Sequence, residues 1–210
     1  MDKILLADIG NTYFHIYNGK NVEHLPYTDA IEKYANRDMC YISVKHALGK
    51  KIEHIKCWNN ISDTLFIEGE YDTMGVDRKA LCLSHKEGIF IDAGSAITVD
   101  VINGGKYVGG FILPGMQAYL ASYKSISSAL DTSLDEALTL ERLPTTTKEQ
   151  ISYGIIASIK SLIDIHSEDK TLYFTGGDGK FLSTFFKDAV YDEMLVFQGM
   201  IKAIKDKKIC

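Results

Sequence analysis

One short pattern occurs twice in this sequence, and the repeat limits the possible folds more than any other feature. In the first copy, the apolar run 3–7 has the length and composition of a strand buried on both faces. It leads into Asp-Ile-Gly-Asn-Thr at 8–12 and then into the aromatic and β-branched segment 13–17. Asn18-Gly19 follows, a dipeptide typical of a type I′ hairpin turn. The sequence therefore predicts antiparallel strands that bend at 8–12.

The second copy begins 84 residues after the first. An apolar run leads into Asp-Ala-Gly-Ser at 92–95, a β-branched segment follows, and Asn-Gly recurs at 103–104. Two copies are too few for a solenoid, so a duplicated domain is the better explanation. We therefore expect an α/β chain of two domains, with residues 1–86 forming the N-terminal domain and residues 87–210 the C-terminal domain.

The segments between and after the copies mix strand and helix patterns, as an α/β chain should. Residues 39–44 and 64–67 are predicted to be strands, and residues 75–85 a helix. The apolar residues from Ile151 to Ile163 recur with a helical period, and a last helix is expected from about Asp192 to Lys205.

Composition excludes some classes of function. The 210 residues carry a formal net charge of -5, which is not the electrostatic footprint of a nucleic-acid-binding protein. No stretch has the 18 or so apolar residues of a membrane span. Cys40, Cys57, Cys82 and Cys210 are scattered and are expected to be free thiols in a reducing compartment. We therefore expect a cytoplasmic protein that binds neither nucleic acid nor membrane.

The turn at 8–12 has the residues that a phosphate-binding turn needs. Glycine lets backbone N–H groups approach phosphate oxygens, Asn11 and Thr12 add hydrogen-bond donors, and Asp8 can hold a cation or its water shell. The same residue types also make ordinary hairpin turns. The second copy at Asp92 favours phosphate binding.

The segment Gly75-Val76-Asp77-Arg78 opens the predicted helix at 75–85 and allows two interpretations. Arg78 can clamp a substrate carboxylate, and Asp77 can act as general base for a substrate hydroxyl. A structural Asp–Arg pair at a helix start explains the spacing equally well.

Five motifs in this order resemble those of the type III pantothenate kinases, small members of the acetate kinase, sugar kinase, Hsp70 and actin superfamily. They are D-x-G-N-T at 8–12, G-x-D-R at 75–78, D-x-G-[ST]-A-x-T-x-D at 92–100, G-G-x-I-x-P-G at 109–115 and T-G-G at 175–177. The resemblance implies the actin-like ATPase fold, with two ribonuclease H-like domains facing a nucleotide cleft. It also implies transfer of the ATP γ-phosphoryl group to pantothenate, the first step of coenzyme A biosynthesis.

The resemblance also implies roles for individual residues. Asp77 would be the catalytic base and Asp92 the ligand of a monovalent cation, K+ or NH4+, with Mg2+ accompanying ATP. The ATP contacts would be Asp8, Ile9, Gly10, Asn11, Thr12, Tyr13, Phe14, His15 and Ser95. The pantothenate contacts would be Gly75, Val76, Asp77, Arg78 and Thr147, with Tyr71 as a further candidate.

Three positions depart from the family pattern, among them Ser95, which stands where the family has a threonine, and two other functions remain as alternatives. His15 stands where the family usually has a lysine, and Tyr71 lies only four residues before Gly75 in an altered lead-in. The family further implies a homodimer. The alternatives are a non-catalytic, nucleotide-binding regulatory relative and another small-molecule kinase of the same superfamily.

Overall fold

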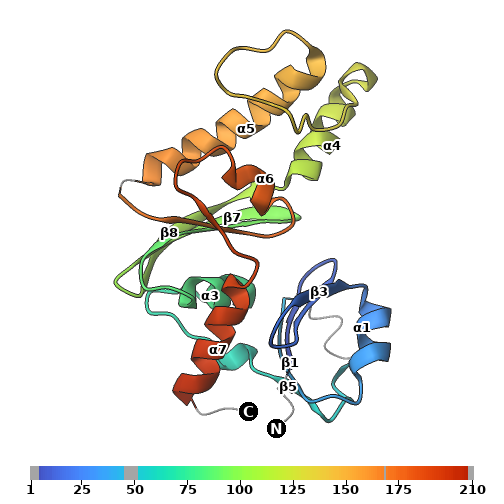
Figure 1. The fold of residues 1–210 in the computed structure, drawn as a ribbon, viewed down its shortest axis with the longest axis vertical. Helices are drawn as coiled ribbons and strands as arrows, with labels where there is room; N and C mark the ends of the chain where they lie inside the picture. The colour runs from blue at the N-terminus through green and yellow to red at the C-terminus, as the bar shows by residue number, and fades with distance from the viewer. Residues whose placement is uncertain (1–4, 45–51, 168, 208–210) are drawn as a thin grey trace. The chain divides into compact units, whose positions relative to one another are not determined.

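The computed structural model describes residues 5–44, 52–167 and 169–207 (Figure 1). The chain divides into two compact units. Unit 1 comprises Met1–Lys86, Asn103–Val108 and Glu193–Cys210, and unit 2 comprises Glu87–Ile102 and Gly109–Asp192. The expected division into domains 1–86 and 87–210 stays a prediction.

The first sheet has five strands in the order β3-β2-β1-β4-β5. β1 lies at its centre, antiparallel to β2 and parallel to β4, and all its residues but Asp8 are buried. This burial is what the apolar run at the start of the chain predicts. The strands are β1 (Leu5–Ile9), β2 (Phe14–Tyr17), β3 (Val22–Leu25), β4 (Met39–Ser43) and β5 (Trp58–Asn60).

Helices cover the two faces of this sheet (Figure 1). Ala7, Ile9 and Ile16 pack against α1 (Tyr27–Tyr34) in one core cluster. On the other face lie α3 (Val76–Leu83) and α7 (Leu195–Lys207), which pack against each other. Tyr17 of β2 meets Phe197 of α7 with ring centroids 5.7 Å apart. Asp8 and His15 alternate with the residues of the α1 face and therefore point to the α7 face.

The second sheet repeats the topology of the first. Its order is β10-β9-β6-β7-β8, with β6 antiparallel to β7 and parallel to β9, as β1 is to β2 and β4. The predicted α/β fold of duplicated topology is confirmed. The strands are β6 (Gly88–Ala93), β7 (Ala96–Asn103), β8 (Lys106–Pro114), β9 (Leu172–Thr175) and β10 (Val190–Tyr191).

The core of unit 2 forms between this sheet and its helices. Ile91 and Phe174 of the sheet pack with Ile155 and Ile159, which recur on one side of the long helix α5. The helices of the unit are α4 (Met116–Ile126), α5 (Thr147–His166) and α6 (Gly179–Ser183).

Hairpin turns are present at both Asn-Gly positions, but the first is not the predicted type I′ turn, because Gly19 has φ +92° whereas the φ of Asn18 is not positive. Asn18 closes the β2–β3 turn, because its side-chain oxygen accepts hydrogen bonds from the N–H groups of Lys20 and Asn21 at 3.0 Å. The β7–β8 turn uses Gly104 and Gly105, both with positive φ. Glycine is favoured at such positions because they crowd any L side chain.

Two further local expectations are wrong. Residues 64–67 are not a strand, because the preceding polar residues close a short 3-10 helix, η1 (Ser62–Thr64), in which the Thr64 hydroxyl donates to the Ile61 carbonyl at 2.6 Å. The outer strand is instead β5. Cys57 and Cys82 are free thiols as expected, whereas Cys40 is disulfide-bonded. Cys210 lies outside the described residues.

Among the described helices, none combines the length and the hydropathy needed to cross a membrane.

The contact between α3 and α7 depends on Gly199. A Cβ atom at this position would overlap the carbonyl oxygen of Ala80. We predict that Gly199→Ala lowers the free energy of unfolding by about 2 to 3 kcal/mol, because the two helix backbones must move apart. Urea denaturation measures the change.

Gly154→Ala is the matched control for this variant. Gly154 also lies inside a helix, but its Cβ would stand at an ordinary 3.6 Å from the Tyr123 hydroxyl. Alanine there should raise the free energy of unfolding by up to about 1 kcal/mol, because glycine is a poor helix former. Equal losses in the two variants would contradict the role assigned to Gly199.

Candidate active site

The turn after β1 is held by two hydrogen bonds at Gly10. The Gly10 N–H donates to the Tyr13 carbonyl at 3.1 Å, which closes the bend into β2. The Tyr27 hydroxyl, at the start of α1, donates to the Gly10 carbonyl at 2.8 Å. Asn11 and Thr12 lie exposed at the tip. The predicted phosphate-binding turn is thus an ordered bend with exposed polar side chains.

The other residues expected to contact ATP from this segment differ in exposure. Ile9 and Phe14 are fully buried, so only their backbones can face a ligand, whereas the Tyr13 side chain is 45% exposed. Asp8 pairs with His15 in the β1–β2 register, which places both side chains on one face.

His15 is coupled to a second histidine. Its Nδ1 atom lies 2.6 Å from Nδ1 of His24 on β3. Burial, and secondarily the neighbouring His24, lower the pKa of His15 from 6.5 to about 4. His15 is therefore neutral at physiological pH.

The turn after β6 is packed through glycines. A Cβ atom on Gly176, which has φ +86°, would overlap a carboxylate oxygen of Asp92 and crowd the Ala93 carbonyl. A Cβ on Gly115 would overlap the carbonyl oxygens of Gly94 and Ser95. The T-G-G and G-G-x-I-x-P-G motifs thus bring backbone close to the second D-x-G turn.

Oxygen atoms of the kind that can hold a cation lie around Asp92. The Asp92 carboxylate and the Ala93 carbonyl meet at the corner that Gly176 leaves open. Carboxylate and carbonyl oxygens are the ligands that hard cations prefer. Asp178 lies at the same corner, where its N–H donates to the Ala93 carbonyl at 2.9 Å and burial raises the pKa of its carboxyl.

At the start of α3, Asp77 takes a defined orientation. Its Oδ1 accepts a hydrogen bond from the Arg78 N–H at 2.8 Å and lies so close to Gly75 that a Cβ there would collide with it. The helix begins with Gly75 as its N-cap, so Asp77 stands in the first turn. The positive end of the helix dipole stabilises a carboxylate at this position.

Arg78 is buried and lies against two tyrosines, a group of three residues that we call the Arg78 cluster. Its side chain is 6% exposed. It donates to the hydroxyl of Tyr71 at 2.5 Å and to that of Tyr107 at 3.4 Å, and its guanidinium carbon lies 5.8 Å from the centroid of the Tyr71 ring. The cluster presents hydroxyl and guanidinium donors together with aromatic surface.

Tyr107 reaches Arg78 because the β7–β8 hairpin is tied to residues 67–70. The Tyr107 N–H donates to the Glu68 carbonyl at 2.8 Å, and Lys106 forms an ion pair with Glu68 at 2.5 Å. Gly69 has φ +87°, and a Cβ there would crowd the Tyr107 carbonyl.

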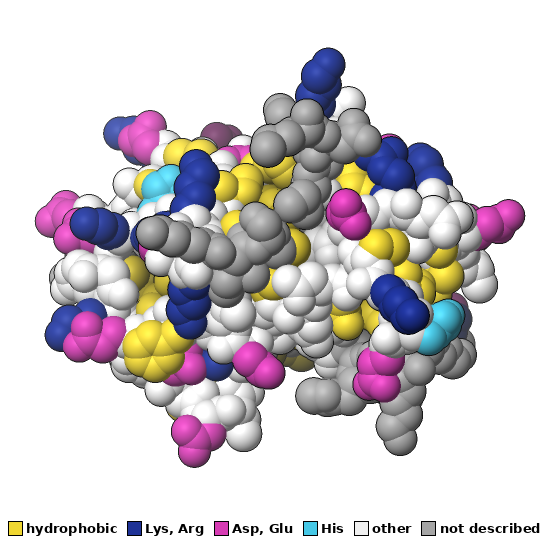
Figure 2. All heavy atoms as spheres, turned by 90° about the horizontal axis from the view of Figure 1, so that it is seen from below, with side chains coloured by type: hydrophobic (Ala, Val, Ile, Leu, Met, Phe, Trp, Pro, Cys, Tyr) yellow, Lys and Arg dark blue, Asp and Glu magenta, His cyan; other side chains and the backbone are white. Residues whose placement is uncertain are grey.

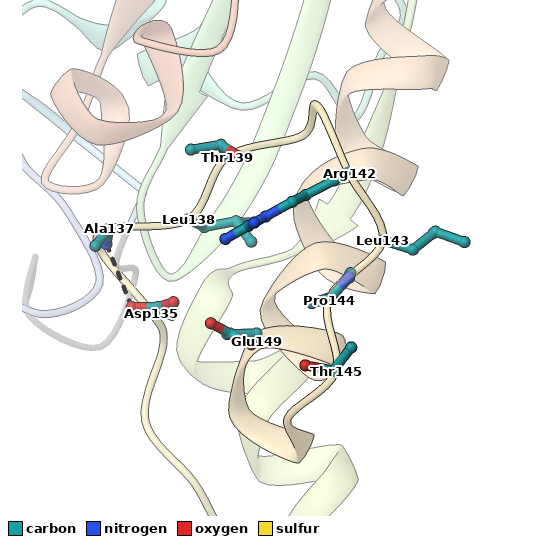
Figure 3. Close-up of a pocket in the computed structure, with 9 residues that line it drawn as sticks. All are labelled: Asp135, Ala137, Leu138, Thr139, Arg142, Leu143, Pro144, Thr145 and Glu149. Carbon is teal, nitrogen blue, oxygen red and sulfur yellow. Dashed lines mark hydrogen bonds between the residues drawn. The ribbon is translucent and has the colours of Figure 1, made fainter.

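Thr147 is exposed at the start of α5 in unit 2. Residues between 135 and 149 line a pocket of about 360 Å³ (Figure 3). Figure 3 shows the Arg142 side chain extending toward Leu138, while Leu143 points away. Thr146 caps the helix, with its hydroxyl 2.8 Å from the Glu149 carboxylate. Of the residues expected to bind ligands, none lines this pocket.

Charges of both signs are intermixed on the face shown in Figure 2. Within the part of the chain that the structure describes, three or more His, Cys, Asp or Glu side chains nowhere gather as a metal-binding group.

Comparison with known proteins identifies the family. The family model described as "Type III pantothenate kinase" matches residues 59–168. The type III pantothenate kinase of Helicobacter hepaticus is 41% identical over 96% of this chain and 98% of its own length. That of Wolinella succinogenes is 38% identical over 98% of both chains. The chain belongs to the type III pantothenate kinase family.

Two solved structures superpose on this chain over nearly its whole length. A Campylobacter jejuni protein named "conserved putative Baf family transcriptional activator" superposes with a TM-score of 0.88 at 36% identity, over 98% of this chain and 99% of its own. A "putative 2-dehydro-3-deoxygalactonokinase" of Sinorhizobium meliloti gives 0.57 at 10% identity, over 97% and 96%. The second likeness shows the fold alone, that of a sugar kinase.

Sequence reasoning about this pantothenate kinase family member missed three residues beside the expected site. Tyr27 holds the first turn, His24 bonds to His15, and Tyr107 completes the Arg78 cluster. Each lies on a neighbouring strand, helix or hairpin, so only the tertiary fold brings it there. The Asn-Gly turns, which set the hairpin registers, were the available signal for His24 and Tyr107.

The lowered pKa of His15 predicts how stability depends on pH. Between about pH 6.5 and pH 4 the unfolded chain binds a proton on this side chain that the folded chain does not. The free energy of unfolding should therefore fall as the pH is lowered through this window. We expect His15→Gln to remove about 1 to 2 kcal/mol of the difference in unfolding free energy between pH 7.5 and 5.

Urea denaturation of both proteins at both pH values measures this double difference. His166→Gln, a change of an exposed histidine on α5, serves as the control and should leave the difference in place. A His15→Gln protein with the same pH dependence as the wild type would contradict the assignment.

Proposed function

We propose that this protein transfers the γ-phosphoryl group of ATP to the primary hydroxyl of pantothenate, yielding 4'-phosphopantothenate in the first step of coenzyme A biosynthesis. The observation that carries the proposal is the start of α3, where the oriented carboxylate of Asp77 adjoins the Arg78 cluster. Membership of the type III pantothenate kinase family supports this choice of substrate.

Asp77 acts as the catalytic base in this proposal. A substrate hydroxyl within hydrogen-bond distance of its carboxylate gives up a proton as the oxygen attacks the γ-phosphorus. Phosphoryl transfer has a loose transition state, so the base mainly orients the nucleophile and need not be strong. A carboxylate held by the Arg78 N–H suits this role.

The pantothenate contacts extend from Gly75 and Val76 through Arg78, with Thr147 and Tyr71 as further contacts. Arg78 and the Tyr71 hydroxyl present donors to the carboxylate or amide groups of the substrate. Tyr107 joins them, because its hydroxyl also lies on the guanidinium. Burial of Arg78 strengthens such contacts, because the effective dielectric constant is lower away from water.

ATP binds at the turn 8–12 and its neighbours Tyr13, Phe14 and His15, with Ser95 as a further contact. Exposed Asn11 and Thr12 and the backbone of the bend provide donors for phosphate oxygens. Mg2+ accompanies ATP, and Asp8 can hold its water shell. Asp92 is the ligand of K+ or NH4+.

Three further properties belong to this proposal. The protein is a homodimer, it acts in the cytoplasm, and residues 1–86 and 87–210 form its two ribonuclease H-like domains. Membership of the family supports the dimer, and the repeated sheet order supports the two domains.

A regulatory function is the second candidate. The name of the similar Campylobacter jejuni structure, a transcriptional activator, favours it. Retention of Asp77, Arg78 and Asp92 argues for catalysis instead, since a purely regulatory nucleotide-binding protein has no use for a base beside a substrate clamp.

Steady-state kinetics tests the proposed activity directly. We predict that ADP release requires both ATP and pantothenate and is several times faster in K+ or NH4+ than in Na+ at equal ionic strength. A coupled ADP assay across these salts gives the result. Absence of turnover with pantothenate in all of them would leave the regulatory function as the better account.

Asp77→Asn tests the catalytic base. The amide keeps the shape of the side chain but cannot accept the proton, so kcat should fall about 10²- to 10⁴-fold while the affinity for ATP is unchanged. Asp72→Asn, an exposed change five residues earlier, is the control and should keep wild-type kcat. Wild-type turnover by Asp77→Asn would remove Asp77 as the base.

A further inference from the structure

His15 and His24 form a pair on neighbouring strands of the first sheet. They stand opposite each other in the β2–β3 register. Their rings meet edge to face with centroids 4.8 Å apart, and the two Nδ1 atoms are 2.6 Å apart. This separation is that of a hydrogen bond between the two nitrogens.

Such a bond has one of two polarities. A neutral imidazole carries one N–H and one lone pair, so either His24 donates to His15 or His15 donates to His24. The polarity sets the tautomer of His15. If Nδ1 of His15 accepts the bond, its proton lies on Nε2, and if Nδ1 donates the bond, it carries the proton itself. The lowered pKa of His15 means that a neutral tautomer, and not the imidazolium, is present at physiological pH.

The second nitrogen of His15 faces the turn. Its Nε2 atom lies 3.6 Å from the position that a Cβ on Gly10 would take, with the neighbouring Cδ2 at 3.8 Å. Gly10 is the residue at which the Tyr13 and Tyr27 hydrogen bonds close this turn. The polarity of the pair therefore decides whether the turn meets an N–H donor or a lone pair.

We propose that His24 is a positioning residue that donates its Nδ1–H to Nδ1 of His15, and so fixes His15 as the tautomer whose Nε2–H points to the phosphate groups of the nucleotide. The inference rests on the proposed binding of ATP at the turn 8–12. It assigns a role to a strand residue that lies outside all of the motifs.

The charges around the pair favour this polarity. Asp8 faces His15 from β1 on the same side of the sheet, and the nucleotide phosphates are anionic as well. Glu23 of β3 is opposite Ile16, on the other face, and is engaged by Lys33 of α1 at 2.7 Å. With the reverse polarity, a lone pair would face anionic oxygens, which is repulsive.

Nitrogen-15 NMR of the free protein at pH 7.5 reads the tautomers directly. We expect His15 to carry its proton on Nε2 and His24 to carry its proton on Nδ1, with resonances assigned through His15→Gln and His24→Asn. A ring contact without a hydrogen bond of defined direction would not favour the Nδ1–H tautomer of His24. Finding that tautomer therefore supports a positioning role and not a merely structural one. Finding the proton of His15 on Nδ1 would overturn the proposal.

Binding of ADP, measured by calorimetry, tests the consequence. His24→Leu removes the donor and should weaken ADP binding about three- to tenfold. His24→Asn places an amide N–H near the position of Nδ1 and should restore most of the affinity. His166→Asn is the control outside the pair. Equal losses in His24→Leu and His24→Asn, or no loss in His24→Leu, would overturn the proposal.

The two arms separate this proposal from the proposed function. If the wild-type protein fails to bind ADP, nucleotide binding at this turn is wrong, and the role of His24 toward phosphate is overturned with it. If ADP binds and the kinase assay succeeds while His15 carries its proton on Nδ1, only the inference about His24 fails. The thermal midpoint of each variant shows whether a loss of affinity reflects unfolding.

Discussion

The central strand of each sheet carries an aspartate as its next-to-last residue, and the pairing of that strand determines what surrounds the carboxylate. Asp8 is held between β2 and β4, and Asp92 between β7 and β9. Because the other residues of β1 are buried on both faces of the sheet, a slip of one position would turn Asp8 into the apolar core against α1. Burial of the apolar residues of β1 therefore fixes the position of Asp8, although Asp8 does not belong to the hydrophobic core.

Glycine residues let other backbone segments pack closely against the turn that follows β6. At Gly176 and Gly115 a side chain would overlap oxygen atoms of the second turn. A Cβ at Gly10 would meet only ordinary contacts. The two repeated turns thus share a sequence pattern but differ in packing. This difference suits a division of work in which the first turn binds phosphate and the second holds a cation.

Local chemistry made much of this structure predictable. The two D-x-G turns and the Asn-Gly hairpins follow from residues adjacent in sequence, and the repeat between them implied the duplicated sheet. The error at 64–67 arose because polar side chains can close a turn that apolar periodicity does not reveal. The Arg78 cluster and the histidine pair depend on register between distant segments. A single sequence fixes that register only through its turns.

The ligand-binding residues proposed in unit 1 include the carboxylates of Asp8 and Asp77 as well as the guanidinium of Arg78, and this mixture of charges affects how an anion can bind. ATP is itself polyanionic, and Asp8 is part of the turn proposed to bind it. His15, which replaces the lysine usual in the family, adds a hydrogen-bond donor but no charge, because burial keeps it neutral. The positive charge that nucleotide binding requires must then come chiefly from metal cations and from helix and backbone dipoles. If ATP binds at this turn as proposed, exchange of a lysine for a neutral histidine would make the nucleotide affinity depend more on bound cations, and the direction of the hydrogen bond between His15 and His24 would then matter for phosphate recognition.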